Sequence, residues 1–319
     1  MIRLIGWLVA GMFLVPQLLA DSFILPPADV DLVGALEYTQ VQPGEDLLDI
    51  ARRYDIGQNE ILLVNAKLDR WLPKPGAKVI IPSRFILPDA PRQGIVLNIP
   101  EMRMYYYPDP RRGEPRKVIT HPVSIGRMDW TTPLGTTRVV AKVKNPSWRP
   151  PASIKQEHAA EGDPLPDVVP PGPDNPLGRY AMRLGIPGYL IHSTNKPYGI
   201  GMRVTHGCVR MYPEDIERLF PEIKVGTPVT LVNQPIKVGW FAGELFIEVH
   251  PPLEEESKPY EAMLEHALAL IEKKIGQFPA IQIDGAALKQ ALQKQQGIPV
   301  KISKSPFQPL LARVSTAKK

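Results

Sequence analysis

The chain has 319 residues, carries a net charge of +5 and contains 37 prolines but a single cysteine. A chain of this length is expected to form two or three domains with enough residues to bury a core. The proline content is about twice the usual fraction, which favours extended segments and long loops and argues against a compact helical bundle. A single cysteine excludes an intramolecular disulfide, and the positive charge suits an anionic partner.

The first twenty residues have the pattern of a cleavable signal peptide. Arg3 supplies the positive start, residues 4–19 form an apolar run, and residues 18–20 offer a cleavage site. An uncleaved anchor is the alternative, but the run is shorter than the roughly 20 residues of a spanning helix and is interrupted by glycine and proline. We therefore expect export, which argues against nucleic acid as the partner. In an oxidising compartment cysteines are normally paired, so a lone cysteine favours a catalytic role.

Residues 21–36 are predicted to be a proline-containing lead-in, followed by a compact unit over residues 37–83. Hydrophobic periodicity and turn residues predict a βααβ order within this unit. The predicted elements are a strand at Tyr38–Val41, helices at Asp46–Tyr54 and Asn59–Asn65, and a strand at Lys78–Ile81. We expect a small α+β domain here.

Residues 84–92 are predicted to be a connector, and residues 94–234 a mainly β domain. Alternation with period two predicts strands at residues 95–99, 103–107, 117–125 and 137–143. The segment from Pro150 to Pro176 is rich in proline and lacks apolar periodicity, so it is predicted to be a long loop. Long loops inside compact domains often cover functional sites, so this segment is either a lid over the site or a loop without a function.

Residues 235–302 are predicted to form a smaller α+β unit. Its expected elements are a hairpin over Trp240–Val249 that turns at Ala242-Gly243, and helices at Pro259–Ile275 and Asp284–Gln295. Asp284 is expected to cap the second helix. The last residues, 303–319, are basic and predicted to be disordered.

The stretch from Ile191 to Met211 contains the only cysteine of the chain, Cys208. A cysteine with one spatially close histidine is the minimal set for covalent acyl transfer, whereas many free cysteines are simply small buried side chains. A predicted strand ends at His192, and a glycine-containing loop follows it. Both ends of the stretch can therefore meet at one site, and we predict cysteine-based acyl transfer there.

The turn His206-Gly207-Cys208 can point consecutive N–H groups at one position, as an oxyanion hole requires. A helix predicted over residues 211–220 would favour the thiolate through its dipole. Arg203 and Arg210 lie beside the nucleophile and could hold a substrate carboxylate. Arg210 could instead brace the loop by bonding backbone carbonyls, and a direct role for the His206 side chain is left open.

A zinc site is the main alternative chemistry, because His192, His206 and Cys208 could supply three ligands. Such a site would activate water and make the protein a hydrolase. No fourth ligand or acidic base stands nearby in the sequence, so no metal and no cofactor is predicted. The remaining histidines are expected to be structural or exposed; they are His121, His158, His250 and His266.

The cysteine stretch resembles the catalytic motif of the YkuD-type L,D-transpeptidases, a histidine followed by Ser/Thr-His-Gly-Cys, a hydrophobic residue and Arg or Asn. Here His192 is followed by the run Thr205-His206-Gly207-Cys208-Val209-Arg210. The resemblance covers residues 94–234 and implies a mainly β sandwich or barrel, with Cys208 as nucleophile and His192 as general base. It also implies that the carbonyl of Ser193 orients the imidazole, and that backbone N–H groups around His206, Gly207 and Cys208 form the oxyanion hole.

Residues 37–83 resemble a LysM module, with landmarks at residues 44–47, Asn65 and Pro75-Gly76. Such modules bind glycans that contain N-acetylglucosamine, and a spacer without binding is the alternative. Residues 235–302 resemble the C-terminal extension of the ErfK/YbiS/YcfS/YnhG group of Gram-negative transpeptidases. This group resemblance implies a periplasmic protein.

The combined resemblance implies that tetrapeptide stems of peptidoglycan are the donors and that a thioester forms on Cys208. An amine of another stem would then give a 3-3 crosslink, and a lysine of an outer-membrane lipoprotein would give a tethered protein. Resolution by water would make the enzyme an L,D-carboxypeptidase. A non-catalytic wall-binding protein that acts through its LysM module is the alternative from a different class.

Overall fold

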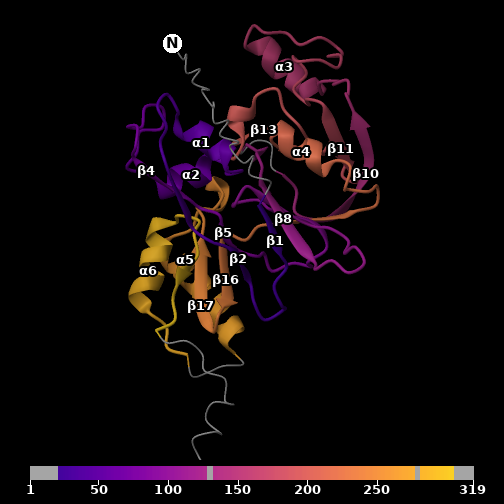
Figure 1. The fold of residues 1–319 in the computed structure, drawn as a ribbon. Coiled ribbons are helices and arrows are strands. Elements are labelled where there is room, and N and C mark those ends of the chain that lie inside the picture. Colours follow the sequence, from indigo (N-terminus) through magenta and orange to yellow (C-terminus); the bar gives the residue numbers. More distant parts are fainter. Residues whose placement is uncertain (1–20, 128–131, 277–280, 305–319) are drawn as a thin grey trace, which may run out of the picture.

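The computed structural model describes residues 21–127, 132–276 and 281–304. The predicted signal peptide and residues 305–319 of the predicted tail lie outside the described residues. Three units are visible in Figure 1: a strand-rich unit, a small unit with α1 and α2, and a unit with the long helix α5. The expected multidomain architecture with a mainly β catalytic unit is confirmed.

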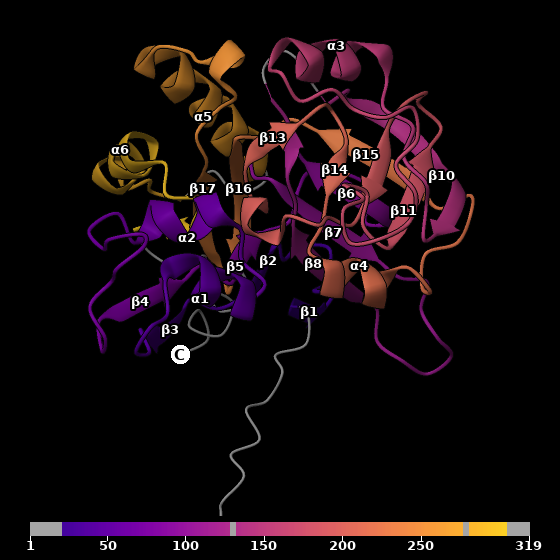
Figure 2. The same cartoon turned by 90° about the horizontal axis from the view of Figure 1, so that it is seen from above.

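The strand-rich unit is built on a nine-stranded sheet, seen from above in Figure 2. Its strands, in spatial order, are β1 (Asp21–Ile24), β8 (Lys117–Pro122), β7 (Arg103–Tyr107), β6 (Gly94–Asn98), β15 (Pro228–Val232), β10 (Gly135–Lys144), β11 (Tyr180–Leu184), β12 (Leu190–His192) and β14 (Val209–Arg210). A short parallel pair, β9 (Ile125–Gly126) and β13 (Arg203–Thr205), lies beside them, and α4 spans Pro213–Leu219. The predicted strands and the predicted helix are therefore present, although the strand expected over 117–125 is divided after Pro122.

The lead-in and the connector, in which the sequence predicted no strand, both contain strands. β1 pairs antiparallel with β8 and forms one edge of the large sheet, while β2 (Leu32–Gly34) pairs with β5 (Arg84–Ile86). Phe85 packs edge-on against both Phe23 and Tyr105. Because the partners of these strands lie far away in the sequence, local periodicity cannot reveal the pairing.

The LysM-like unit has the predicted βααβ order: β3 (Glu37–Gln40), α1 (Leu47–Arg53), α2 (Gln58–Val64) and β4 (Lys78–Ile81). Asp46 caps α1 by accepting the N–H groups of Leu48 and Asp49. The Asn65 amide bonds the backbone of Ile61 and of Ile80, which ties the end of α2 to β4. A local core with residues such as Leu47, Ile50 and Ile81 fills the space between the helices and strands.

The C-terminal unit also follows the prediction. Its elements are β16 (Ile236–Phe241), β17 (Glu244–Val249), the 3-10 turn η2 (Glu254–Glu256), α5 (Tyr260–Ile275), α6 (Gly285–Lys294) and β18 (Val300–Lys301). Asp284 caps α6 as expected. Ser303 is an exception to the predicted disorder from residue 303 onward, because it is buried and its hydroxyl accepts the Leu245 N–H.

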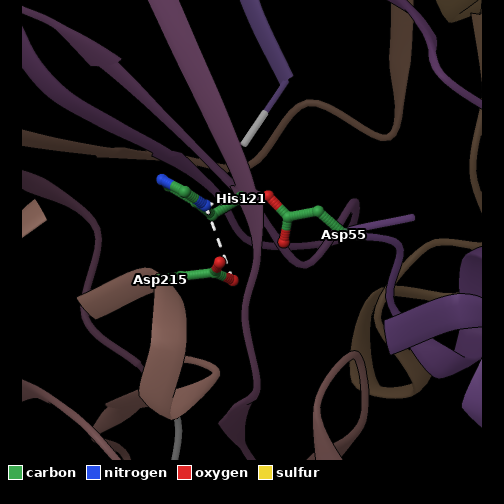
Figure 3. Close-up of side chains that lie close together, drawn as sticks. All are labelled: Asp55, His121 and Asp215. Carbon is green, nitrogen blue, oxygen red and sulfur yellow. Dashed lines mark hydrogen bonds and ion pairs between the residues drawn. The ribbon is translucent and has the colours of Figure 1, made fainter. Parts of the chain in front are cut away.

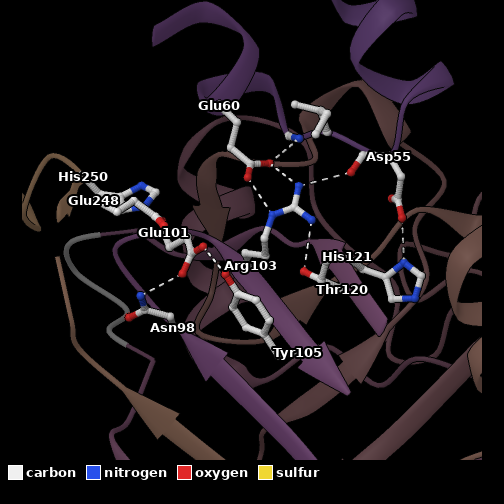
Figure 4. A network of polar contacts seen from close by, with 12 residues as sticks. Asp55, Glu60, Asn98, Glu101, Arg103, Tyr105, Thr120, His121, Glu248 and His250 are labelled. Atoms are coloured by element: carbon white, nitrogen blue, oxygen red, sulfur yellow. Dashed lines mark hydrogen bonds and ion pairs between the residues drawn. The ribbon is translucent and has the colours of Figure 1, made fainter. Parts of the chain in front are cut away.

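A buried ionic cluster joins the C-terminal unit to the large sheet. Lys237 Nζ lies 2.9 Å from a carboxylate oxygen of Glu101 and 2.8 Å from one of Glu248. His250 Nε2 contacts Glu248 at 2.6 Å, and Tyr105 donates to Glu101 (Figure 4). These charges are compensated within the protein, so the two units share a paired polar interface.

The proline-rich segment is not all loop, because α3 (Ala152–Ala160) lies within it. This helix has one buried apolar residue, Ile154. The helix therefore has no apolar stripe, and apolar periodicity in the sequence could not predict it. Among the described residues no helix has both the length and the apolar character that a bilayer crossing requires.

Candidate active site

The parallel pairing of β12 with β14 brings the two ends of the predicted catalytic stretch together. Ile191 lies opposite Val209, and His192 lies opposite Arg210. Ile191 and Val209 are buried in the core of the sheet. Because side chains alternate between the two faces of a strand, His192 and Arg210 project to the other face, and Cys208 directly precedes β14. The Arg210 charge acts on both His192 and Cys208, so the fold brings the predicted base and the predicted nucleophile within reach of one arginine.

His192 is buried, and its Nδ1 lies 2.6 Å from the carbonyl oxygen of Ser193. A carbonyl only accepts, so Nδ1 carries the proton and Nε2 is the basic nitrogen. Burial, assisted by the nearby Arg210 charge, lowers the pKa of His192 to about 3, against the opposite effect of the Ser193 and Leu177 carbonyls. The imidazole is therefore neutral at physiological pH, with an unprotonated Nε2.

Cys208 is half-buried, and its thiol contacts the carbonyl of Gly188 at 3.5 Å. Burial raises the pKa of the Cys208 thiol, while a backbone contact from Leu190 and the charge of Arg210 act in the opposite direction. The sequence predicted a thiolate favoured by a helix dipole, but α4 begins only at Pro213, after β14. A dipole acts mainly within the first turn, so α4 does not favour the thiolate. With its pKa raised by burial, Cys208 rests as a thiol.

The backbone of the His206-Gly207-Cys208 turn is held by two threonine hydroxyls. Thr132 donates to the Gly207 carbonyl at 3.0 Å, and Thr205 donates to the Cys208 carbonyl. Gly207 has φ +94°, a conformation that favours glycine. Within the described ranges, the N–H groups of Gly207 and Cys208 have no hydrogen-bond acceptor. Two adjacent donors are thus available for an oxyanion.

His206 points toward α3, where its Nε2 lies 3.0 Å from a carboxylate oxygen of Glu157. The other Glu157 oxygen bonds the guanidinium of Arg127. The helix inside the proline-rich segment is therefore attached to the cysteine motif. Sequence reasoning missed Glu157 because nothing in that segment distinguishes this carboxylate from its acidic neighbours.

The two arginines of the site have different surroundings. Arg203 forms a bidentate ion pair with Glu255 of η2, at 2.8 and 2.9 Å, and also bonds the Gly126 carbonyl. Arg210 makes no side-chain hydrogen bond or ion pair with any residue that the structure describes, and its Nε is buried. Arg203 thus braces the motif against the C-terminal unit, whereas Arg210 forms none of the carbonyl contacts considered for it with residues 21–127, 132–276 or 281–304.

Metal ligands were considered at His192, His206 and Cys208. In the described part of the chain, two clusters of side chains have potential metal-ligand atoms within 4.8 Å of one another, and neither contains these three residues. Both clusters are buried: the first is Asp55, His121 and Asp215 (Figure 3), and the second is Glu101, Glu248 and His250. Arg218 pairs with Asp215 and Lys237 pairs with Glu248, so protein cations already compensate these carboxylates. His121 and His250 belong to these clusters, and His158 and His266 lie on α3 and α5.

Two family profiles match the chain: the L,D-transpeptidase catalytic domain, YkuD, over residues 92–231, and the LysM domain over residues 39–82. The probable L,D-transpeptidase YcfS of Escherichia coli K12 is 38% identical over 296 residues, which cover 91% of this chain and 91% of YcfS. The probable L,D-transpeptidase ErfK/SrfK of Salmonella typhimurium is 37% identical over 292 residues, or 89% of this chain and 92% of that protein.

Solved structures give a weaker likeness. The catalytic domain of the E. faecium L,D-transpeptidase, determined by NMR, is 22% identical, covers 46% of this chain and 100% of that one, and has a TM-score of 0.33. The family assignment therefore rests on the sequence matches. These matches confirm the combination of a YkuD and a LysM resemblance found in the sequence.

Proposed function

This chain is an L,D-transpeptidase of the YkuD family, and on that premise we propose that Cys208 is its nucleophile and His192 its general base. The observation that supports the proposal is the β12–β14 pairing, which sets His192 opposite Arg210, two positions after Cys208. The Ser193 carbonyl supports the assignment, because it holds the imidazole in the tautomer with a basic Nε2.

The donor is a tetrapeptide stem of peptidoglycan. His192 takes the thiol proton of Cys208 as the sulfur attacks the carbonyl carbon of the L,D bond before the terminal D-alanine. The C–N bond then breaks, D-alanine leaves with the proton returned by His192, and the acyl group remains as a thioester. An amine attacks the carbonyl carbon of this thioester and gives a proton to His192. The C–S bond then breaks, and His192 returns the proton to the sulfur, which restores the Cys208 thiol as the amide product departs.

Two backbone N–H groups and two arginines assist these steps. The N–H groups of Gly207 and Cys208, beside His206, stabilise each oxyanion, and loss of one such donor typically costs about 10²- to 10³-fold in rate. Arg210 is close enough to influence the His192 and Cys208 charges and has no carboxylate partner among the described residues. We assign it to a substrate carboxylate and to the developing thiolate. Arg203 contributes indirectly, through its bond to Gly126.

The domain boundaries support a division of labour. We assign residues 37–83 to glycan binding, residues 94–234 to catalysis, and residues 235–302 to bracing the site through Glu255. The segment at residues 150–176 is assigned to a lid, because Glu157 attaches it to His206. Export to the periplasm by residues 1–20 would bring the enzyme to its substrate.

The acceptor is an amine, from a second stem to give a 3-3 crosslink or from a lipoprotein lysine to give a tethered protein. Glu157 of α3 contacts His206 and Glu255 of η2 contacts Arg203, so both elements lie against the segment that carries Cys208. These elements would determine which amine enters. Water is the competing acceptor, and its use would give L,D-carboxypeptidase activity.

The proposal is tested by mass spectrometry of disaccharide-tetrapeptide incubated with residues 21–319. Wild type should release D-alanine and yield a dimer, whereas Cys208→Ala and His192→Ala should not. His266→Ala is the matched control, because this histidine lies on the exposed side of α5. D-alanine release by the Cys208→Ala variant would refute the assignment of the nucleophile, and a tripeptide in place of a dimer would identify water as the acceptor.

A further inference from the structure

The LysM unit is embedded in the active-site region of the catalytic unit. Most of the contact is made by residues 55–60, which follow α1 and run into the first turn of α2 and which we call the docking loop, and Arg52 of α1 adds an ion pair. The partners lie on β7 and β8, at the start of α4, and in residues 193–205, the linking segment between His192 and the cysteine motif. The module thus contacts the chain on both sides of the proposed nucleophile.

Backbone atoms make the first set of contacts. The Gln58 N–H donates to the Ile200 carbonyl at 2.9 Å, and the Asn59 N–H donates to the Gly201 carbonyl at 3.3 Å. A Cβ added to Gly201 would lie 2.4 Å from the Gln58 nitrogen and 2.5 Å from the Gly57 Cα. The two backbones are therefore in direct contact, with no room for a side chain at this position.

Buried ionic contacts make the second set. Glu60 forms a bidentate pair with Arg103 at 2.7 and 2.9 Å, and Arg103 also donates to the Asp55 carbonyl (Figure 4). The Asp55 side chain lies 2.9 Å from Nδ1 of His121, which is also 3.5 Å from Asp215 on α4 (Figure 3). Separating the two units would leave these charges buried without partners or exposed after costly rearrangement, so docking is a permanent part of the fold.

A third set of contacts holds the start of α4. Arg52 of α1 forms a bidentate ion pair with Glu214, at 2.7 and 3.0 Å. The Tyr212 hydroxyl donates to the Ile56 carbonyl at 3.2 Å. Tyr212 is only four positions after Cys208 in the sequence, so the module restrains the chain shortly before and shortly after the nucleophile.

We propose that the LysM unit has a second role as a positioning element of the active site, in which the docking loop sets the placement of Cys208 relative to His192. This inference rests on the proposed function of that pair. It means that turnover of a sugar-free tetrapeptide, which offers the module no glycan to bind, still depends on docking. A module that only delivers glycan would leave the turnover of such a donor unchanged.

The first test compares Gly201→Ala with wild type on the sugar-free tetrapeptide, with the full chain from residue 21. We expect kcat and the rate of Cys208 alkylation by iodoacetamide to change, with kcat falling about tenfold or more, because small misplacements of reacting groups are costly. Gly113→Ala is the matched control: Gly113 also has a positive φ, +81° against +84°, but an added Cβ meets nothing within 4 Å. A kcat for Gly201→Ala within twofold of the control would overturn the proposal.

The second test reverses charges on the two units and needs no change in the linking segment. Arg52→Glu and Glu214→Arg should each lower kcat about threefold or more, and the double variant should restore it, because the ion pair is re-formed in the opposite sense. Single variants with wild-type kcat, or a double variant no better than the singles, would contradict the proposal. Failure of the proposed function would look different, since wild type itself would then release no D-alanine.

Discussion

The pair of Arg103 and Glu60 gives the sharpest test of how the LysM and catalytic units are held together. The Arg103 side chain has 0% exposure and the Glu60 side chain 8%. Glu60→Gln keeps the shape of the side chain but removes the charge opposite the guanidinium. Removing one partner of a buried ion pair typically costs about 3–5 kcal/mol, because the remaining charge is left without compensation.

A loss of that size should lower the midpoint of thermal unfolding by roughly 6–20 °C in a folding unit of about 200 residues. Urea unfolding followed by circular dichroism should show the same loss in the free energy of unfolding. Asp109→Asn is the matched control, because it removes a carboxylate from a highly exposed pair with Lys224 and should have no measurable effect.

A double variant, Arg103→Met with Glu60→Leu, separates the cost of an unpaired charge from the value of the pair. It should recover most of the stability lost in Glu60→Gln, since apolar replacements of a buried pair are often neutral. Recovery should be incomplete, because Arg103 also bonds Thr120 and the Asp55 carbonyl. If Glu60→Gln lost less than about 1 kcal/mol, the guanidinium would have to reach water, and the reasoning from burial would be refuted.

Three further predictions concern the site and the cores. The pKa of His192 is lowered to about 3 and that of Cys208 is raised, so neither group titrates between pH 6 and 8. The rate of Cys208 alkylation should therefore rise about tenfold per pH unit in this range, without an inflection near pH 6.5. A plateau of the rate in this range would indicate a preformed thiolate–imidazolium pair. Burial lowers the pKa of His121, but its two carboxylate neighbours outweigh burial and raise the pKa to about 10, so its stabilising contribution is complete below about pH 6.5 and should be lost as the pH rises toward 10. Burial and Asp215 also raise the pKa of Asp55, to about 8, which adds to the loss of stability below that pH. The melting temperature should therefore fall with rising pH, and His121→Asn should make the fall above pH 8 less steep. Ile271→Ala should destabilise the C-terminal unit by about 2–5 kcal/mol in urea unfolding, whereas Leu268→Ala on the exposed side of α5 should not.

Local patterns were sufficient where a feature depends on neighbouring residues. The capping of α1 and α6 follows from Asp46 and Asp284, and the hairpin of β16 and β17 turns at Ala242-Gly243 as expected. The cysteine motif is contiguous, so its resemblance to a family could be recognised without knowledge of the fold. In each case the information lies within about ten residues.

Long-range partners could not be predicted in this way. β1 is only four residues long, and its partner β8 begins almost a hundred residues later. Glu157 looks like any acidic residue of a proline-rich segment, although it contacts His206. The rise in the Cys208 pKa depends on burial, a property of the assembled site that no local pattern contains.

The ionic contacts between the units explain why a domain-by-domain interpretation was incomplete. Glu60 and Arg103 each look like ordinary surface charges within their own segment, yet the fold buries both. An apolar interface tolerates small shifts, whereas a bidentate buried pair is satisfied in only one arrangement. Such pairs are therefore suited to fix the LysM unit in one position against the chain that carries Cys208. Charged residues that look like surface residues in the sequence therefore connect the LysM unit to the segment that carries Cys208.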